Sequence, residues 1–381
     1  MKQGGTMDWF ITDYEIDPPE GAERAVLEDS IMHKGRPVTA GSKILEKFIS
    51  PIDAEVVTRL EAAGVTILGK TKMDEFGAAG LFADAQKQPS GAVSLVASGI
   101  AAFALCNDYT GTLRHQSAAQ GVCYIHPTYG TVSRYGLIPA VSSMDQIGIV
   151  CKAPEDGLRA LTLIAGHDPR DGAMFSTAQE AKEKSEERGE PVIGIPENVM
   201  AKTRDKSAVE EFVKGFSTVG IELKYFDIFA QIMQILCCAE LSNNISRYDG
   251  IKYGYRTDKY SDMQELYTGS RTEAFGPDVK LASLIGAMVL SQDNYARYYD
   301  KAMRIRRLIK ESLEFDKYDA IIMPASEDKP GSMLAMHALP QLCGLPSVTV
   351  SHKNSGVSLI ADAKCENVLF SLLDKAKAVG K

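Results

Sequence analysis

The sequence lacks the features that mark an exported or membrane-spanning protein. Its longest nearly apolar run, residues 94–106 (SLVASGIAAFALC), is shorter than the roughly 20 residues that a membrane-spanning helix needs. The N-terminal stretch MKQGGTMDWF contains no apolar core of the kind found in signal peptides. We therefore expect no membrane span, no export and a cytoplasmic location.

Excess positive charge and regularly spaced cysteines are also missing. The formal net charge is −8, so the protein as a whole does not attract the negatively charged phosphate backbone of nucleic acid. Nucleic acid is therefore not expected as a direct partner unless a local patch departs from this average. The seven cysteines form no C-x-x-C pair, and no histidine stands at metal-ligand spacing. We expect small buried thiols, with no disulfide, metal site or cofactor.

What is present is the pattern of an α/β protein. Residues 53–69 (DAEVVTRLEAAGVTILG) carry apolar residues at helical spacing, then Gly64 as a stop, then a short β-branched run. Residues 94–108 repeat this order of helix, break and buried strand. Alternating elements of this kind predict a layered α/β fold with helices on the faces of a sheet.

The rest of the chain predicts one discontinuous core. Residues 176–190 are nearly all polar and are expected to be a solvated connection between residues 1–175 and a new strand at 191–196. From about 207 to 315 the pattern is mostly helical, including SAVEEFVKGFSTVG, and strand character returns at 318–325 and 345–351. We therefore predict a single domain over residues 1–381, whose second half, 191–381, completes the sheet of the first.

The segment 106–118 (CNDYTGTLRHQSA) is the best candidate for chemistry. Gly111 permits a tight strand-to-helix turn, and the backbone amides at Tyr109, Thr110 and Gly111 could stabilise an oxyanion. Thr112 could then act as a nucleophile, although no base stands beside it in sequence. The alternative is that Thr112 caps the following helix, and His115 is expected to point to a different face from Thr112.

Six further segments repeat, in order, the motifs of one enzyme family. They are GSKILEKF (41–48), LGKTKMDEF (68–76), HPTYGTVSRYGLIPAVSSMDQIG (126–148), AGHDPRD (165–171), SNNISRYDGIKYGYRT (242–257) and KYDAIIMPA (317–325). On these motifs the chain resembles the amidase signature family, most closely GatA, a component of the glutamine-dependent tRNA amidotransferase. The resemblance implies the amidase signature fold, a single mixed, twisted β-sheet covered by helices, here shortened at the N-terminus.

The resemblance also implies where the catalytic residues should stand. Enzymes of this family use a serine nucleophile, a bridging serine on a cis peptide and a lysine base. The family's D-T-G-G-S-I-R reads DYTGTLR at residues 108–114, which puts Thr112 at the nucleophile position, and Glu28 falls at the lysine position. Counting back from residue 108 puts Gln88 at the bridging serine, although a one-residue gap would select Ser90 instead.

The residues that hold glutamine in GatA-type enzymes are replaced as well. Leu281 or Ala282 stands where the resemblance implies an arginine, and Leu334 where it implies an aspartate. An amino acid carrying both charges would lose its charge-assisted hydrogen bonds at these positions. We expect free glutamine to bind poorly, and the sequence assigns no other substrate-binding residue.

These changes favour a pseudoamidase, a GatA-like chain that serves in binding or assembly without hydrolysis. The alternative is a divergent amidase, with Thr112 as nucleophile and Glu28 as base, that hydrolyses a small carboxamide. Glu28 could equally be a carboxylate that pairs with a cation or is solvated at a strand end. Expected partners are GatB- and GatC-like proteins, a second copy of the chain, or a small ligand other than glutamine. Substitute bases could come from four lysines, at positions 34, 43, 70 and 72.

Overall fold

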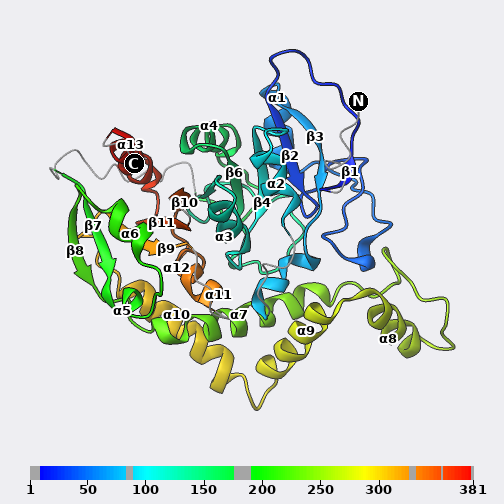
Figure 1. Ribbon diagram of the computed structural model, residues 1–381. Helices are drawn as coiled ribbons and strands as arrows, with labels where there is room; N and C mark the ends of the chain where they lie inside the picture. The colour runs from blue at the N-terminus through cyan, green and yellow to red at the C-terminus, as the bar shows by residue number, and fades with distance from the viewer. Residues whose placement is uncertain (1–8, 83–88, 176–189, 326–331, 353–354, 379–381) are drawn as a thin grey trace.

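The computed structural model describes residues 9–82, 89–175, 190–325, 332–352 and 355–378, and strands from both halves of the chain join one sheet (Figure 1). Within these residues eleven strands lie in the order β1-β3-β2-β4-β6-β5-β10-β11-β9-β7-β8. Their bounds are β1 Phe10–Asp13, β2 Arg24–Glu28, β3 Thr66–Thr71, β4 Phe103–Asn107, β5 Cys123–His126, β6 Ile147–Cys151, β7 Val192–Pro196, β8 Ser217–Ile221, β9 Ala320–Pro324, β10 Ser347–His352 and β11 Ser355–Ala361.

The sheet is mixed, and its parallel part positions the candidate site. Strands β3, β2 and β4 are parallel neighbours, whereas β6, β5, β10 and β11 continue the sheet in antiparallel pairs. Leu27 of β2 pairs with Leu105 of β4, so these two strands end side by side. The residues that follow them therefore meet at one edge of the sheet, as at the carboxyl ends of parallel strands in other α/β proteins.

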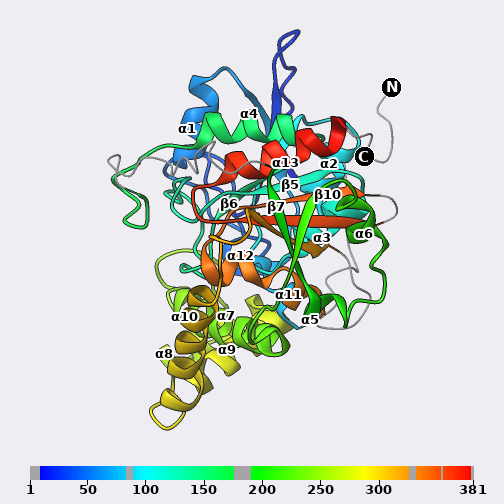
Figure 2. The same cartoon turned by 90° about the vertical axis from the view of Figure 1, so that its left-hand side faces the viewer.

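Helices cover both faces of the sheet. Helices α1, α4, α6 and α13 pack on one face of the sheet, and α2 and α3 pack on the middle of the other face. Helices α7, α9, α10 and α12 form a layer that packs with β9 and β11, in the second half of the sheet (Figures 1 and 2). The bounds are α1 Glu55–Ala62, α2 Gly91–Ala97, α3 Thr112–Ala119, α4 Pro154–Ile164, α5 Glu197–Met200, α6 Ser207–Phe212, α7 Phe229–Ile245, α8 Met263–Ala274, α9 Pro277–Leu290, α10 Lys301–Glu311, α11 Ser332–Met336, α12 Ala338–Cys343 and α13 Glu366–Ala378.

Short helical turns connect several of these elements. The 3-10 turns are η1 Lys43–Leu45, η2 Glu75–Gly77, η3 Ala79–Leu81 and η5 Phe226–Ile228, and a π-helical turn, η6 Ala296–Asp300, precedes α10. None of the helices in the described part of the chain is long and apolar enough to cross a membrane.

Most of the segments expected from the sequence form as predicted. Residues 53–69 contain α1 and β3, residues 94–108 contain the end of α2 and all of β4, and the strands expected at 191–196, 318–325 and 345–351 are β7, β9 and β10. The helical prediction for SAVEEFVKGFSTVG was wrong in its second half. Gly215, at φ +81°, ends the helical stretch, and the β-branched residues after it form the edge strand β8 instead. The predicted connection at 176–190 lies almost wholly outside the described residues.

Candidate active-site region

Asp108 organises the turn between β4 and α3. Its Oδ1 accepts a hydrogen bond from the backbone N–H of Gly111 at 2.8 Å, and its Oδ2 accepts one from the backbone N–H of Arg114 at 3.0 Å. Gly111 has φ +88°, a left-handed conformation that suits glycine. The alternative that Thr112 caps α3 was therefore wrong, because the side chain that accepts from the N–H groups of Gly111 and Arg114 at the start of this helix is Asp108.

Helix α12 fixes the same turn from the other side. The fully buried guanidinium of Arg114 pairs with Asp108 at 3.2 Å and also donates to the backbone oxygen of His337 at 3.0 Å. Gln341 donates its Nε2 to the backbone oxygen of Asp108 at 2.7 Å. A Cβ atom placed on Gly111 would lie only 2.3 Å from the Cβ of His337, so the turn and the start of α12 meet at closest approach here.

Thr112 is the first residue of α3, and its hydroxyl is paired with another hydroxyl. Its Oγ1 lies 2.9 Å from Oγ1 of Thr110, and a Cβ on Gly80 would approach both oxygens to 2.5 Å. In the described part of the chain no carboxylate, imidazole or amine forms a hydrogen bond with Thr112. His115 turns away, as expected, and its Nδ1 lies 3.1 Å from the backbone oxygen of Ala325.

The expected oxyanion donors are only partly available. The N–H of Gly111 is already bonded to Asp108, whereas the N–H groups of Thr110 and Thr112 have no acceptor within the ranges that the structure describes. The side chain of Tyr109 points into the core, where its hydroxyl donates to the backbone oxygen of Phe76 at 2.8 Å. Two amides beside a hydroxyl pair could therefore bind an oxygen atom of a ligand.

Glu28 ends β2 in a site with almost no solvent. Its side chain is buried, and its Oε2 accepts hydrogen bonds from the backbone N–H of Asn107 and from the hydroxyl of Ser30, both at 2.9 Å. Burial raises the pKa of Glu28 from about 4.5 to about 8, despite these two hydrogen bonds. The alternative of a solvated or ion-paired carboxylate was wrong, since Glu28 forms no ion pair with any described residue.

Of the four candidate lysines, only Lys70 is fully buried next to Glu28. Its Nζ donates to the backbone oxygen of Ile31, and burial lowers its pKa to about 8 in spite of the nearby carboxylates of Asp29 and Glu28. The sequence gives a signal for this burial, because Lys70 lies inside the strand β3, two residues after its apolar pair Ile67 and Leu68. Lys43, by contrast, lies at 4.1 Å over the ring of Tyr255.

Comparison with known proteins assigns the family. The family model described as Amidase matches residues 25–83 and 89–353, which is most of the chain. The chain belongs to the amidase signature family. The match is interrupted at residues 84–88, which include Gln88, and the structure does not describe residues 83–88.

Curated relatives of this amidase-family chain include components of one enzyme. It is 36% identical over 90% of its length to the A subunit of glutamyl-tRNA(Gln) amidotransferase from Lachnoclostridium phytofermentans, covering 79% of that protein. It is 37% identical over 85% of its length to the protein of the same name from Maridesulfovibrio salexigens, covering 72% of it. The predicted GatA-like family membership is confirmed.

Solved structures confirm the fold. The corresponding amidotransferase component of Thermotoga maritima superposes with a TM-score of 0.72 at 24% identity, over 95% of this chain and 85% of the other. A protein from a vestigial complex related to an s-triazine catabolic enzyme superposes with a TM-score of 0.78 at 19% identity, over 99% and 92%. The predicted mixed sheet covered by helices is therefore the observed one.

The structure describes three further predicted substrate positions of this amidase-family chain and the alternative bridging residue, none of which forms a hydrogen bond with Thr112. Ser90, the alternative bridging residue, precedes α2, and its backbone N–H donates to Oε1 of Gln116 at 2.7 Å. Leu281 is exposed on α9, whereas Ala282 and Leu334 are packed in the core. Since the two leucines and the alanine carry no polar group, none of these positions offers an ionic anchor for an amino acid.

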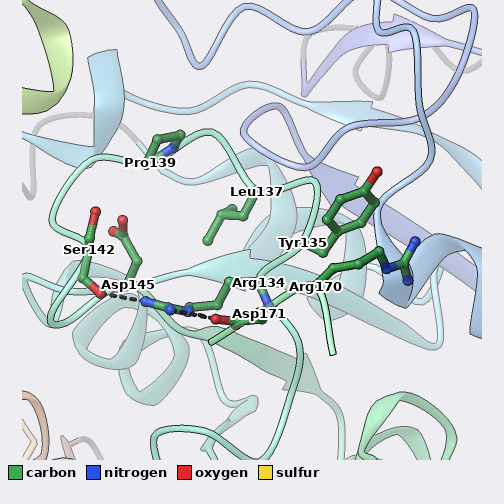
Figure 3. Close-up of a pocket in the computed structure, with 8 residues that line it drawn as sticks. All are labelled: Arg134, Tyr135, Leu137, Pro139, Ser142, Asp145, Arg170 and Asp171. Atoms are coloured by element: carbon green, nitrogen blue, oxygen red, sulfur yellow. Dashed lines mark hydrogen bonds and ion pairs between the residues drawn. The ribbon is translucent and has the colours of Figure 1, made fainter. Parts of the chain in front are cut away.

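Asn107, whose backbone N–H bonds to Glu28, also contacts the wall of a small pocket through its side chain. The pocket encloses about 170 Å³ and is lined by Arg134, Tyr135, Leu137, Pro139, Ser142, Asp145, Arg170 and Asp171 (Figure 3). Arg134 spans it, paired with Asp171 at 2.7 Å. Asp145 accepts a hydrogen bond from Nδ2 of Asn107 at 2.8 Å, so this wall braces the end of β4. Each charged group of the pocket already has a protein partner: Arg134 pairs with Asp171, Arg170 with Asp168, and Asp145 accepts from Asn107. We therefore interpret the pocket as a brace for the 127–146 loop.

Proposed function

We propose that this chain is a GatA-like member of the amidase family that does not carry out serine-type amide hydrolysis and instead serves in binding or assembly. The observation that carries the proposal is the burial of Glu28, whose described hydrogen bonds come from the N–H of Asn107 and the hydroxyl of Ser30 and not from Thr112. With a pKa near 8, its side chain is mainly a neutral carboxylic acid at pH 7, and a protonated carboxylic acid cannot accept a proton from a nucleophile.

The surroundings of Thr112 support the same proposal. Nucleophilic attack by an alcohol requires a base within hydrogen-bonding reach of its oxygen. The hydroxyl of Thr112 has only the hydroxyl of Thr110 as a described partner, and a threonine hydroxyl is far too weak a base for this role. Thr112, Gln88 and Glu28 thus remain our assignments for the three altered catalytic positions.

The test is an ammonia-release assay at pH 7 with the purified chain. The substrates are glutamine, asparagine and a panel of primary carboxamides, and the control is a Thr112→Ala variant shown by circular dichroism to be folded. We expect the two proteins to give the same background. Turnover by the natural chain that disappears in Thr112→Ala would contradict the proposal.

The competing function is a divergent amidase in which ionised Glu28 is the base. The raised pKa gives this alternative a distinct signature: activity should increase about tenfold per pH unit below pH 8 and level off above it, as Glu28 ionises. The same assay from pH 6.5 to 9.5 therefore distinguishes the two functions, and a fluorophosphonate adduct on Thr112 would favour the amidase.

We further propose that the chain acts beside GatB- and GatC-like proteins in the cytoplasm. The support is its likeness to proteins named as amidotransferase subunits. Mild affinity isolation followed by mass spectrometry tests this, and recovery of the chain alone, as a monomer, would count against it.

A further inference from the structure

A second cavity, larger than the one beside Arg134, lies beside α10 and α12, and Thr112 is not among its lining residues. It encloses about 510 Å³, within the range of small-molecule sites. Its lining comprises Thr128, Tyr129, Ser143, Phe175, Met303, Arg306, Arg307, Lys310, Leu342, Cys343, Gly344 and Ala363. Three of these residues are cations and none is an acid, in a protein whose net charge is −8.

The cations come from one face of α10. Met303, Arg306, Arg307 and Lys310 are spaced three, four and seven residues apart, so they share one side of the helix. Arg306 is held in place by hydrogen bonds to the backbone oxygens of Leu342, Gln341 and Ser143 and to the hydroxyl of Ser143. Its guanidinium is therefore a fixed positive charge in the wall of the cavity.

Lys310 supplies a charge that no described protein group neutralises. Its ammonium has no hydrogen bond or ion pair with any described residue, and its side chain is exposed. The carboxylates near the cavity are bonded to other groups, and one of them, Glu311, neutralises the cavity residue Arg307. Glu240 binds the N–H and hydroxyl of Ser143, Glu311 pairs with Arg307 at 2.6 Å, and Glu366 accepts the N–H of Thr128 at 2.8 Å.

The rest of the lining is largely apolar. Phe175, Met303, Leu342, Cys343 and Ala363 provide rings, methyl groups and a thiol that carry no charge. Burial raises the pKa of Cys343 to about 12, so this thiol stays neutral and adds no negative charge to the wall. The hydroxyl of the buried Thr128 accepts a hydrogen bond from the N–H of Lys364 at 2.8 Å and keeps its own proton to donate.

We propose that this cavity binds a small molecule with an anionic group, a phosphate or a carboxylate, on an apolar body. The anionic group would lie against Lys310, beside the fixed positive charge of Arg306, where a charge-assisted hydrogen bond from the ammonium is strongest, and the apolar body against Phe175, Met303 and Leu342. Such a ligand would contact α12, whose Gln341 bonds to the Asp108 turn. The inference is independent of the proposed function, because it requires no reaction at Thr112.

The experiment uses phenyl phosphate and benzoate as probes, with benzyl alcohol as the uncharged comparison, by isothermal titration and ligand-detected NMR on the full chain. Lys310→Glu reverses a charge in the cavity. Lys301→Glu reverses the same charge nine residues earlier, on the opposite face of α10, where Lys301 is exposed and does not line the cavity. If Lys310→Glu does not fold, Lys310→Met, which removes the ammonium and keeps an unbranched four-atom chain, replaces it, with Lys301→Met as its control.

We expect saturable binding of at least one anion, weaker binding of benzyl alcohol, a loss of about tenfold or more in Lys310→Glu and less than about twofold in Lys301→Glu. A preference for phenyl phosphate or for benzoate identifies which anionic group the site takes. The proposal is overturned if neither anion saturates, if benzyl alcohol binds as tightly as the anions, or if the two lysine variants lose the same affinity.

Discussion

Glu28 shows how burial alone changes the chemistry of a residue. A carboxyl group taken from water into the sheet edge loses solvation that two hydrogen bonds do not replace, and its pKa rises to about 8. In the unfolded chain the same group ionises near its ordinary value of about 4.5. Folding therefore binds a proton at Glu28 between these two pH values, and stability decreases as the pH rises through this window.

We predict that Glu28→Gln stabilises the protein at pH 7 to 8 by about 3–4 kcal/mol and leaves stability nearly unchanged at pH 4.5. The glutamine oxygen can still accept from Asn107 and Ser30, while the cost of keeping a proton bound is removed. Urea unfolding at several pH values measures this. The idea fails if the variant and the natural chain have the same pH dependence of unfolding free energy.

Gly111 is the residue at which the turn and α12 come closest. We predict that Gly111→Ala destabilises the protein by about 2–4 kcal/mol, because a Cβ would both strain the left-handed backbone and overlap His337. Gly121→Ala is the matched control, since Gly121 has φ +74° with nothing within 4 Å, and should cost about 1 kcal/mol. Equal shifts in melting temperature for the two variants would show that the contact with His337 is unimportant.

At the scale of elements, α3 is tied to β4 and α12 by one aspartate. Asp108 caps the helix, pairs with buried Arg114 and, through its backbone oxygen, receives Gln341. A buried ion pair adds little net stability as a whole, yet removing one partner leaves an uncompensated charge in the core. The junction of these three elements should therefore be sensitive to one substitution.

We predict that Asp108→Asn costs about 3–5 kcal/mol, since Arg114 would keep its charge without a counter-ion. The comparison is Asp205→Asn on the exposed start of α6, where Asp205 accepts from the backbone N–H and the hydroxyl of Ser207; its cost should stay below about 1 kcal/mol. Both values come from denaturant unfolding, and a loss at Asp108 no larger than at Asp205 would refute the role of the buried pair.

At the scale of the whole molecule, stability should decrease from the middle of the sheet to its edges. Strands β4, β5 and β6 are buried along their full length, whereas the edge strand β8 is largely exposed and β1 alternates between partial burial and exposure. We predict slow amide hydrogen exchange in 103–107, 123–126 and 147–151 and fast exchange in 217–221, measured by mass spectrometry. Protection in β8 equal to that in β6 would contradict this gradient.

Local patterns were enough to predict the elements that are buried and regular. Helical spacing and β-branched runs predicted α1, β3 and β4, because those patterns reflect burial on one face or both. The same reasoning failed at β8, where an exposed edge strand carries no alternation of polar and apolar residues, and at Asp108, whose capping role depends on a turn that sequence spacing does not reveal.

The sequence by itself determined the family, the α/β class and which side chains stand at positions 28 and 112, because covalent order and motif spacing carry that information. Only the tertiary structure decided what those side chains can do. Burial at the side-by-side ends of β2 and β4 raises the pKa of Glu28 to about 8, and one face of α10 brings three cations to a cavity whose lining includes no acid. Solvation and long-range contacts set protonation and charge pairing, and neither can be read from local spacing.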